Sequence, residues 1–134
     1  MRLHHLRGRK VNSHVLARGE LWRGRTMQIR WIPGVPVTVW QQLKERSPQG
    51  LYVGSYASTR LSKRAVDRNR MRRRCKEALR IVTKEMQELP TAQLLLSPRS
   101  SSLTCDYADI VGDVRSFLSF LSQCLNKRRS GAAS

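Results

Sequence analysis

The chain has 134 residues, and its 26 Lys and Arg against 9 Asp and Glu give a formal net charge of +17. This length indicates a single domain, while no apolar run reaches the roughly 18–20 residues of a membrane-spanning helix and no apolar run follows the basic first ten residues as in a secretory signal. The 3 cysteines form no CxxC pair, which argues against a disulfide scaffold or zinc knuckle and favours a reduced, cytoplasmic protein.

The first half of the chain is predicted to contain one helix and two strands. Apolar residues one helical turn apart favour a short amphipathic helix over 6–17. Apolar and polar residues alternate over 25–32, which predicts a strand with one buried face. Segment 33–50 opens with Pro-Gly-Val-Pro, which breaks that strand, and its β-prone residues fit either a strand or an ordered loop. A second strand, rich in Tyr and Val, is expected over 51–58.

The second half contains the clearest helix. Over 65–89, apolar residues recur at helical spacing and form one stripe, which consists of Met71, Cys75, Ala78, Leu79, Val82, Met86 and Leu89. A short buried strand over 93–96, a Ser-rich loop over 98–104 and a last amphipathic helix follow, the helix capped by Thr104 or Asp106. We expect one domain over 1–125 and a basic flexible tail over 126–134. The order predicts an α+β fold, a small α/β sandwich with three helices on one mostly four-stranded sheet.

The distribution of charge indicates the class of partner. Residues 1–30 hold 8 basic residues and 1 acid, and residues 60–80 hold 10 basic residues and 2 acids. Two stretches therefore carry almost all of the excess charge, whereas a merely solvated surface would spread it evenly. The pattern favours a nucleic acid as partner, with an anionic membrane surface as the second choice.

Residues suited to catalysis are scarce. His4, His5 and His14 lie near the N-terminus without acidic neighbours, and no pair of acids has the spacing of a two-metal nuclease. Three aspartates share a face of the last helix, namely Asp106, Asp109 and Asp113. A solvated N-terminal turn, favoured by the helix dipole, explains them better than a metal site does. No catalytic residue and no metal site in the protein itself is predicted.

The helix over 65–89 carries the strongest signal. Its polar stripe lies opposite the apolar one and contains Asn69, Arg73, Lys76, Arg80 and Lys84. Arg68 lies in the first turn, where it can emerge at the edge of the sheet. Free N–H groups at the helix start add to the positive field, and such an arrangement suits several closely spaced phosphates, as in folded RNA.

At these residues the sequence resembles a known family. Residues 58–73 read Ser-Thr-Arg-Leu-Ser-Lys-Arg-Ala-Val-Asp-Arg-Asn-Arg-Met-Arg-Arg, which is similar to the "RNR" signature of the protein component of bacterial ribonuclease P. The preceding strand, the short strand and the last helix follow in the family's order. The resemblance covers about residues 3–125.

The resemblance implies a fold and a function. The fold has an unusual left-handed β-α-β crossover, opposite to the usual hand, of a type also found in the second domain of a small-subunit ribosomal protein. The protein is expected to bind the catalytic RNA of ribonuclease P and the 5′ leader of precursor tRNA, and to promote removal of the leader. Catalysis resides in the RNA subunit, which mainly binds the required Mg²⁺. Position in the motif implies that the RNA-binding residues are Arg60, Lys63, Arg64, Arg68, Asn69, Arg70, Arg72, Arg73 and Lys76.

The leader is expected in a cleft between the sheet and the first helix. The family commonly places two Phe residues on that helix, where this chain has Asn12 and Leu16, so base stacking there is lost. Thr59 replaces a usual Lys. Strand alternation and position add polar candidates to this pair, namely Gln28, Arg30, Tyr56 and Arg99. Trp31 and Trp40 could stack on bases, but core packing is the favoured role for each.

Two alternatives share the basic charge. A non-enzymatic RNA-binding module, such as a ribosomal protein, fits the composition but not the signature placed after a strand. A DNA-binding helix module would need a two-helix unit that the sequence does not show.

Overall fold

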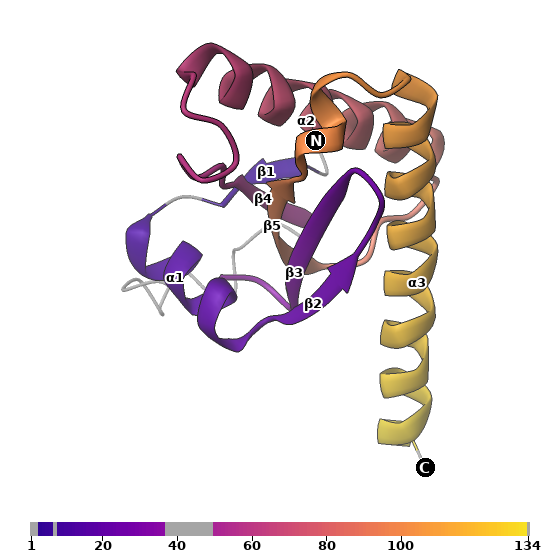
Figure 1. Cartoon of the computed structure of the whole chain (residues 1–134). Helices are drawn as coiled ribbons and strands as arrows, with labels where there is room; N and C mark the ends of the chain where they lie inside the picture. Colours follow the sequence, from indigo (N-terminus) through magenta and orange to yellow (C-terminus); the bar gives the residue numbers. More distant parts are fainter. Residues whose placement is uncertain (1–2, 7, 37–49, 134) are drawn as a thin grey trace.

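The structure is a computed structural model that describes residues 3–6, 8–36 and 50–133, with side chains as far as residue 126. Within these ranges it contains five strands, three α-helices and one 3-10 helix (Figure 1). In chain order the elements are β1 (Leu3–His5), α1 (Arg9–Arg18), β2 (Glu20–Arg23), β3 (Met27–Pro33), β4 (Leu51–Ser55), α2 (Ala65–Glu85), β5 (Ala92–Pro98), the 3-10 helix η2 (Ser100–Leu103) and α3 (Tyr107–Ala133). The α+β class predicted from the sequence is confirmed.

The strands form one mixed sheet in the order β1-β4-β5-β3-β2. β4 is parallel to both β1 and β5, whereas β3 is antiparallel to β5 and β2. Because α2 connects the parallel neighbours β4 and β5, these three elements form the expected β-α-β crossover. Its left hand stays a prediction. Among the described residues, none of the helices combines the length and the hydropathy of a membrane-spanning segment.

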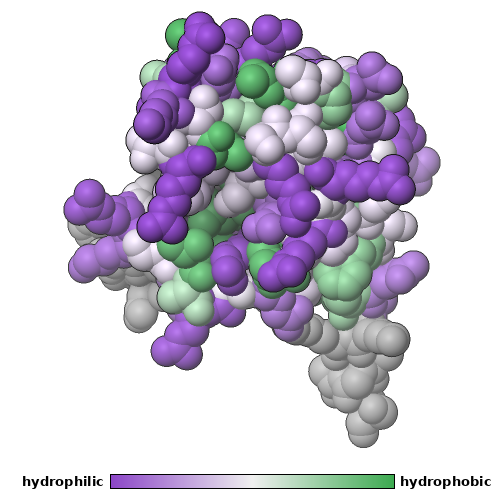
Figure 2. Space-filling model, in the orientation of Figure 1, coloured by the Kyte–Doolittle hydropathy of each residue, from purple (hydrophilic) through white to green (hydrophobic). Residues whose placement is uncertain are grey.

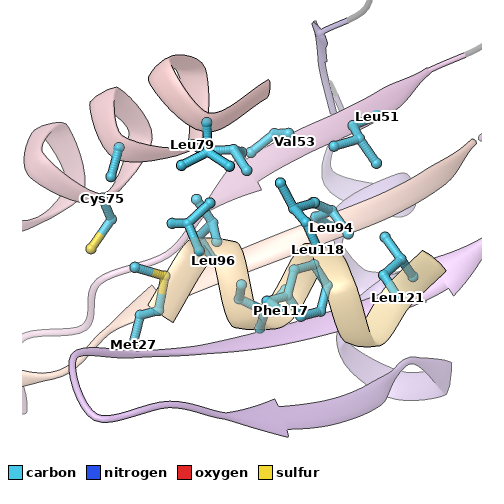
Figure 3. Close-up of a cluster of buried hydrophobic side chains, with 14 of the residues drawn as sticks. Met27, Leu51, Val53, Cys75, Leu79, Leu94, Leu96, Phe117, Leu118 and Leu121 are labelled. Carbon is cyan, nitrogen blue, oxygen red and sulfur yellow. The ribbon is translucent and has the colours of Figure 1, made fainter. Parts of the chain in front are cut away.

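The main core lies between one face of the sheet and the helices α2 and α3. The alternation predicted for β3 is confirmed, since Met27, Ile29 and Trp31 are at most 1% exposed. Figure 3 shows side chains of β3, β4 and β5 facing those of α2 and α3, among them Leu79 and Phe117. Burying such large apolar side chains provides most of the driving force for folding.

α1 lies against the opposite face of the sheet (Figure 1). There Val15 packs with Leu6, Tyr52 and Leu95 in a smaller cluster of buried residues. We call this side, which also carries Gln28 and the other outward side chains of β3, the outer face. It is the side on which the sequence placed the leader cleft.

The sheet has five strands, whereas a mostly four-stranded sheet was expected. The difference arises because the sequence analysis did not predict β1 and β2. β1 has three residues, two of them His, and β2 reads Glu-Leu-Trp-Arg, so neither shows the alternation of a longer strand. The pairing of β1 continues to Leu6, whose N–H donates to the Val53 carbonyl at 2.9 Å. This pairing delays the start of the first helix to Arg9, whereas a start at residue 6 was expected.

Several boundaries also differ. The strand expected over 51–58 ends at Ser55, and α2 ends at Glu85, although Met86 and Leu89 still pack against the core. The expected loop over 98–104 contains η2. α3 runs to Ala133, so the backbone of the expected flexible tail is helical. Residues 37–49, including Trp40, lie outside the described residues.

Candidate nucleic-acid interface

The outward face of α2 carries cations without partners. The buried side chains of the helix, from Met71 to Val82, fix its orientation against the core. Arg70, Arg73 and Lys76 therefore face solvent and are exposed, and within the described residues their side chains make no hydrogen bond or ion pair. Figure 2 shows hydrophilic side chains over this upper part of the molecule. These three groups are available to bind phosphates.

Arg68 has a different environment from the one expected. Its Nη1 donates to the carbonyls of Ser62 at 2.8 Å and Lys63 at 3.1 Å, and the side chain is half-buried. The guanidinium therefore ties the turn before α2 to the first turn of the helix. Arg68 was expected to emerge at the edge of the sheet, and its side chain is only half-buried there, although two backbone carbonyls bind it. Its contact with RNA stays a prediction.

The turn tied by Arg68 carries three of the predicted RNA-binding cations. Arg60 and Lys63 are exposed, and Arg64 is exposed with a loose contact of 3.9 Å to Asp67. The backbone N–H of Arg64 donates to the Ser62 hydroxyl at 3.2 Å, which orders the residue that precedes the helix. The cations of the turn are therefore held beside those of α2.

Three further polar side chains of α2 have partners within the chain. Arg72 donates to the Oδ1 of Asn69, so these two predicted residues bind each other. Arg74 donates to the carbonyls of Ser102 at 2.6 Å and Cys105 at 2.7 Å, which joins α2 to η2 and the start of α3. Arg74 thus has a structural role.

The acidic residue of this face does not oppose the free cations. Glu77 accepts from Arg80, and this hydrogen bond holds the pKa of the Glu77 carboxyl below its ordinary value. Because Glu77 pairs with Arg80 one turn further along α2, its charge does not neutralise the cations of the preceding turns.

Two adjoining hollows lie where β4 ends beside α2. One, of about 290 Å³, is lined by Ser55 and by residues of α2, including Asn69, Arg72, Arg73 and Lys76. The other, of about 330 Å³, also has Ser55 and Lys76 in its wall, and extends to His5, Gly54 and Asn12. Lys76 and Ser55 therefore join the predicted RNA-docking residues to one end of the predicted leader cleft.

Asn12 fills the space beside β4 in this second hollow. Its amide nitrogen donates to the carbonyls of Leu6 at 3.0 Å and Gly8 at 2.8 Å. A Cβ at position 54 would come within 2.5 Å of the Asn12 Oδ1, so this close approach requires glycine. Asn12 thus closes the connection between β1 and α1, and its amide hydrogens are not free for a base.

The other leader candidates are spread along the outer face. The register sets Gln28 opposite Ser97, and Tyr56 follows the β4 residue paired with Leu96, so all three lie on one row across the sheet. Arg30 is half-buried one row nearer α1. Leu16 is 48% and Tyr56 is 53% exposed. Arg99 is exposed just after β5. Of these candidates, Asn12 lies in a hollow whose wall also includes the docking residue Lys76.

Some contributors had no signal in the sequence. His5 enters the second hollow because β1 pairs with β4, which the sequence analysis missed. Ser55 lines both hollows because β4 ends there, beside α2. Asp113 accepts from the Thr26 N–H at 2.7 Å and hydroxyl at 2.6 Å, so it anchors the β2–β3 hairpin to α3 and is not the solvated group that was expected.

The thiols and acids in the described part of the chain are not gathered at one site. Cys75 is buried, and this burial raises the pKa of its thiol to about 12. Within the described part of the chain, no three His, Cys, Asp or Glu side chains are grouped so that they could hold a metal ion. What the arrangement can do chemically is bind polyanions.

Comparisons with known proteins agree with this chemistry. A family described as Ribonuclease P matches residues 1–122. The chain is 33% identical over 100 residues to the ribonuclease P protein component of Synechococcus sp. (strain RCC307), which covers 75% of this chain and 77% of the relative. Its fold is similar to the RNase P proteins of Staphylococcus aureus (TM-score 0.65, 12% identity, 88% of this chain and 94% of the other) and Thermotoga maritima (TM-score 0.64, 13% identity, 86% and 94%).

Proposed function

The chain belongs to the ribonuclease P protein family, as the protein subunit of a ribonucleoprotein endoribonuclease that processes the 5′ ends of tRNA, and we propose how its surfaces divide that work. The outward face of α2 and the preceding turn bind the catalytic RNA. The outer face of the sheet, beside α1, binds the 5′ leader of precursor tRNA.

One observation carries the assignment of α2. Arg70, Arg73 and Lys76 are exposed cations without a partner in the described residues, on a helix whose other side is fixed in the core. A cation with no partner in the protein can bind a phosphate without first breaking an ion pair, so the whole gain from counterion release contributes to affinity. Lys76, Arg73 and Ser55 also line one hollow, which suits the close approach of a phosphate.

The leader assignment rests on the polar outer face. Gln28 and Tyr56 lie on one row, Arg30 lies beside it, and Asn12 reaches the hollow that Lys76 also lines. Leu16 offers an aliphatic surface in place of an aromatic one, so the leader is held more by charge and backbone contacts than by stacking.

Mg²⁺ enters this function through the RNA. The described side chains show no cluster of three potential metal ligands, and the site is strongly basic, so it would repel a divalent cation. We propose that the RNA subunit mainly binds the Mg²⁺ that leader cleavage requires. A cytoplasmic location is supported by the free thiols of Cys75, Cys105 and Cys124 and by the tRNA substrate.

Reconstitution with the catalytic RNA tests the α2 assignment. The variant Arg70→Ala, Arg73→Ala, Lys76→Ala should weaken assembly and flatten the dependence of log K on log salt by about 2 to 3 units, since each lost phosphate contact removes about 0.7–0.9. Far-ultraviolet circular dichroism should stay unchanged, because these side chains do not pack in the core.

A matched control removes the same charge elsewhere. Lys10 and Arg18 of α1 and Arg115 of α3 are exposed and lie outside the proposed docking face. Replacing Lys10, Arg18 and Arg115 by Ala should change assembly much less. Equal effects of the two triple variants would mean that only net charge matters, and the assignment of α2 as the docking face would be abandoned.

A further inference from the structure

The tip of the β2–β3 hairpin carries a second group of free cations. Arg23 ends β2, Arg25 lies in the turn and Arg99 follows β5 next to it, since the Arg99 N–H donates to the Thr26 carbonyl at 2.8 Å. All three arginines are exposed. We call Arg23, Arg25 and Arg99 the tip arginines.

The backbone that carries the tip arginines is firmly held. The Asp113 carboxylate of α3 accepts two hydrogen bonds from Thr26, at 2.7 Å and 2.6 Å. The Ser101 hydroxyl donates to the Arg25 carbonyl at 2.8 Å. At position 24 a Cβ would come within 2.8 Å of the Asp113 Oδ2, so a glycine lets α3 approach this closely. An ordered backbone lowers the entropy cost of presenting charged side chains to a ligand.

The charge of the tip is not neutralised within the protein. Within the described residues no carboxylate forms an ion pair with a tip arginine, and the Asp113 carboxylate beside the turn is bound to Thr26. Figure 2 shows hydrophilic side chains gathered around this end of the hairpin. Exposed guanidinium groups with no partner suit phosphate oxygens.

The strand register connects the tip to the outer face. Arg23 is opposite Gln28, which is opposite Ser97, and Tyr56 lies next in the same row. The row crosses from β4 to β2 in three steps of about 4.8 Å, which is roughly 14 Å in total. One end of the row reaches the turn that leads to α2, and the other end reaches the tip arginines.

We propose that the tip arginines bind the phosphates of the 5′ leader at nucleotides remote from the cleavage site. This inference rests on the proposed function, in which α2 docks the catalytic RNA. Because the tip lies at the end of the row away from α2, a leader that crosses the row reaches Tyr56 and Gln28 first and the tip last. Short leaders end before the tip, and longer leaders contact it.

Substrates with leaders of different length test this inference in the reconstituted holoenzyme. Precursor tRNAs with a single-nucleotide leader and with a leader of about ten nucleotides, within the usual span of single-strand sites, are bound under conditions that prevent cleavage. The variant Arg23→Ala, Arg25→Ala should bind the long-leader substrate about ten-fold more weakly, as two lost phosphate contacts imply. Its affinity for the single-nucleotide substrate and for the catalytic RNA should not change.

The control variant Arg115→Glu lowers the net charge by the same two units at a residue of α3 that lies outside both proposed RNA-binding surfaces, and it should leave both substrates unaffected. Equal weakening of both substrates, or weaker binding of the catalytic RNA, would assign the tip to another RNA surface and overturn the inference. No difference from the control would make the tip a merely solvated surface. If the wild-type holoenzyme does not bind the substrate with the longer leader more tightly, the assignment of the outer face to the leader is itself refuted. This outcome is seen in the wild-type measurement, before any variant is compared.

Discussion

Arg68 provides the sharpest separation between a residue that contacts RNA and one that positions other residues. The sequence groups it with Arg70 in one signature, yet Arg68 donates to the Ser62 and Lys63 carbonyls while Arg70 is exposed. We expect Arg68→Ala to release the turn over 58–64, and Arg70→Ala to remove a phosphate contact. Both changes should weaken assembly with the catalytic RNA, for different reasons.

The expected size of the Arg68 effect follows from its two hydrogen bonds. A hydrogen bond from a charged donor contributes about 1.5–3 kcal/mol, and half-exposure reduces this, so about 2 kcal/mol for the pair is a reasonable value. If the ordered turn is the form that binds RNA, that penalty corresponds to roughly a 30-fold loss of affinity. Global stability should fall less, because the turn lies outside the main core.

Two measurements distinguish the two roles. Hydrogen exchange in residues 58–64 should accelerate in Arg68→Ala and stay unchanged in Arg70→Ala. The salt dependence of assembly should flatten by about 0.7–0.9 units in Arg70→Ala and by clearly less in Arg68→Ala. If Arg68→Ala flattens it equally while exchange of the turn is unaltered, Arg68 contacts phosphate directly and the reasoning is refuted.

Other side chains support further tests. Asp113→Ala removes an acceptor of two hydrogen bonds, so unfolding free energy should fall by about 2–4 kcal/mol and Tm by about 10 °C; the exposed Asp109 is the control, and an equal shift in Asp109→Ala would contradict this role. Burial raises the Cys75 pKa from 9.0 to about 12, so the folded protein keeps the thiol protonated at a pH where the unfolded chain loses the proton. The contribution of this buried thiol to the free energy of unfolding is therefore lost as pH rises above 9. The stability difference between the wild type and Cys75→Ala should therefore narrow from about pH 8 to about pH 11, and a constant difference would be inconsistent with the shift. Leu16→Phe, at a side chain 48% exposed, should strengthen leader binding by about 1–3 kcal/mol through stacking, whereas Asn12→Phe should lower Tm because the Asn12 amide donates two hydrogen bonds; leader affinity unchanged in Leu16→Phe would place the leader elsewhere.

The sequence predicted those elements in which apolar residues recur at a regular spacing over many residues. The stripe of α2 and the alternation of β3 both reflect burial against one large core, so the pattern and the structure agree at Met71 and at Ile29. β1 was missed because its order comes from pairing with β4, a contact about 48 residues away in the chain that no local pattern encodes. The same missed pairing hid the place of His5 in the wall of the second hollow.

The sequence predicted where the cations gather but not their individual contacts. The cations of 60–80 lie on α2 and the turn before it, as the sequence indicated, and their binding of RNA stays a prediction. Whether an arginine is free depends on which backbone carbonyls the folded chain, locally or from a distant segment, brings within reach of its guanidinium. The carbonyls of Ser102 and Cys105 bind Arg74, and those of Ser62 and Lys63 bind Arg68. Asp113 was misjudged for the same reason, because its partner Thr26 is 87 residues distant in the chain.

This division of the cations has a quantitative consequence for assembly. Of the 10 basic residues in 60–80, five are bound within the chain, namely Arg64, Arg68, Arg72, Arg74 and Arg80. Five are without a partner among the described residues. If only the free cations displace counterions, the slope of log K against log salt for binding the catalytic RNA is about −4, whereas ten contacts would give about −8. A slope near −8 would mean that RNA breaks the internal bonds of Arg68 and Arg74, and the structured turn and the α2–η2 contact would then be features of the free protein alone.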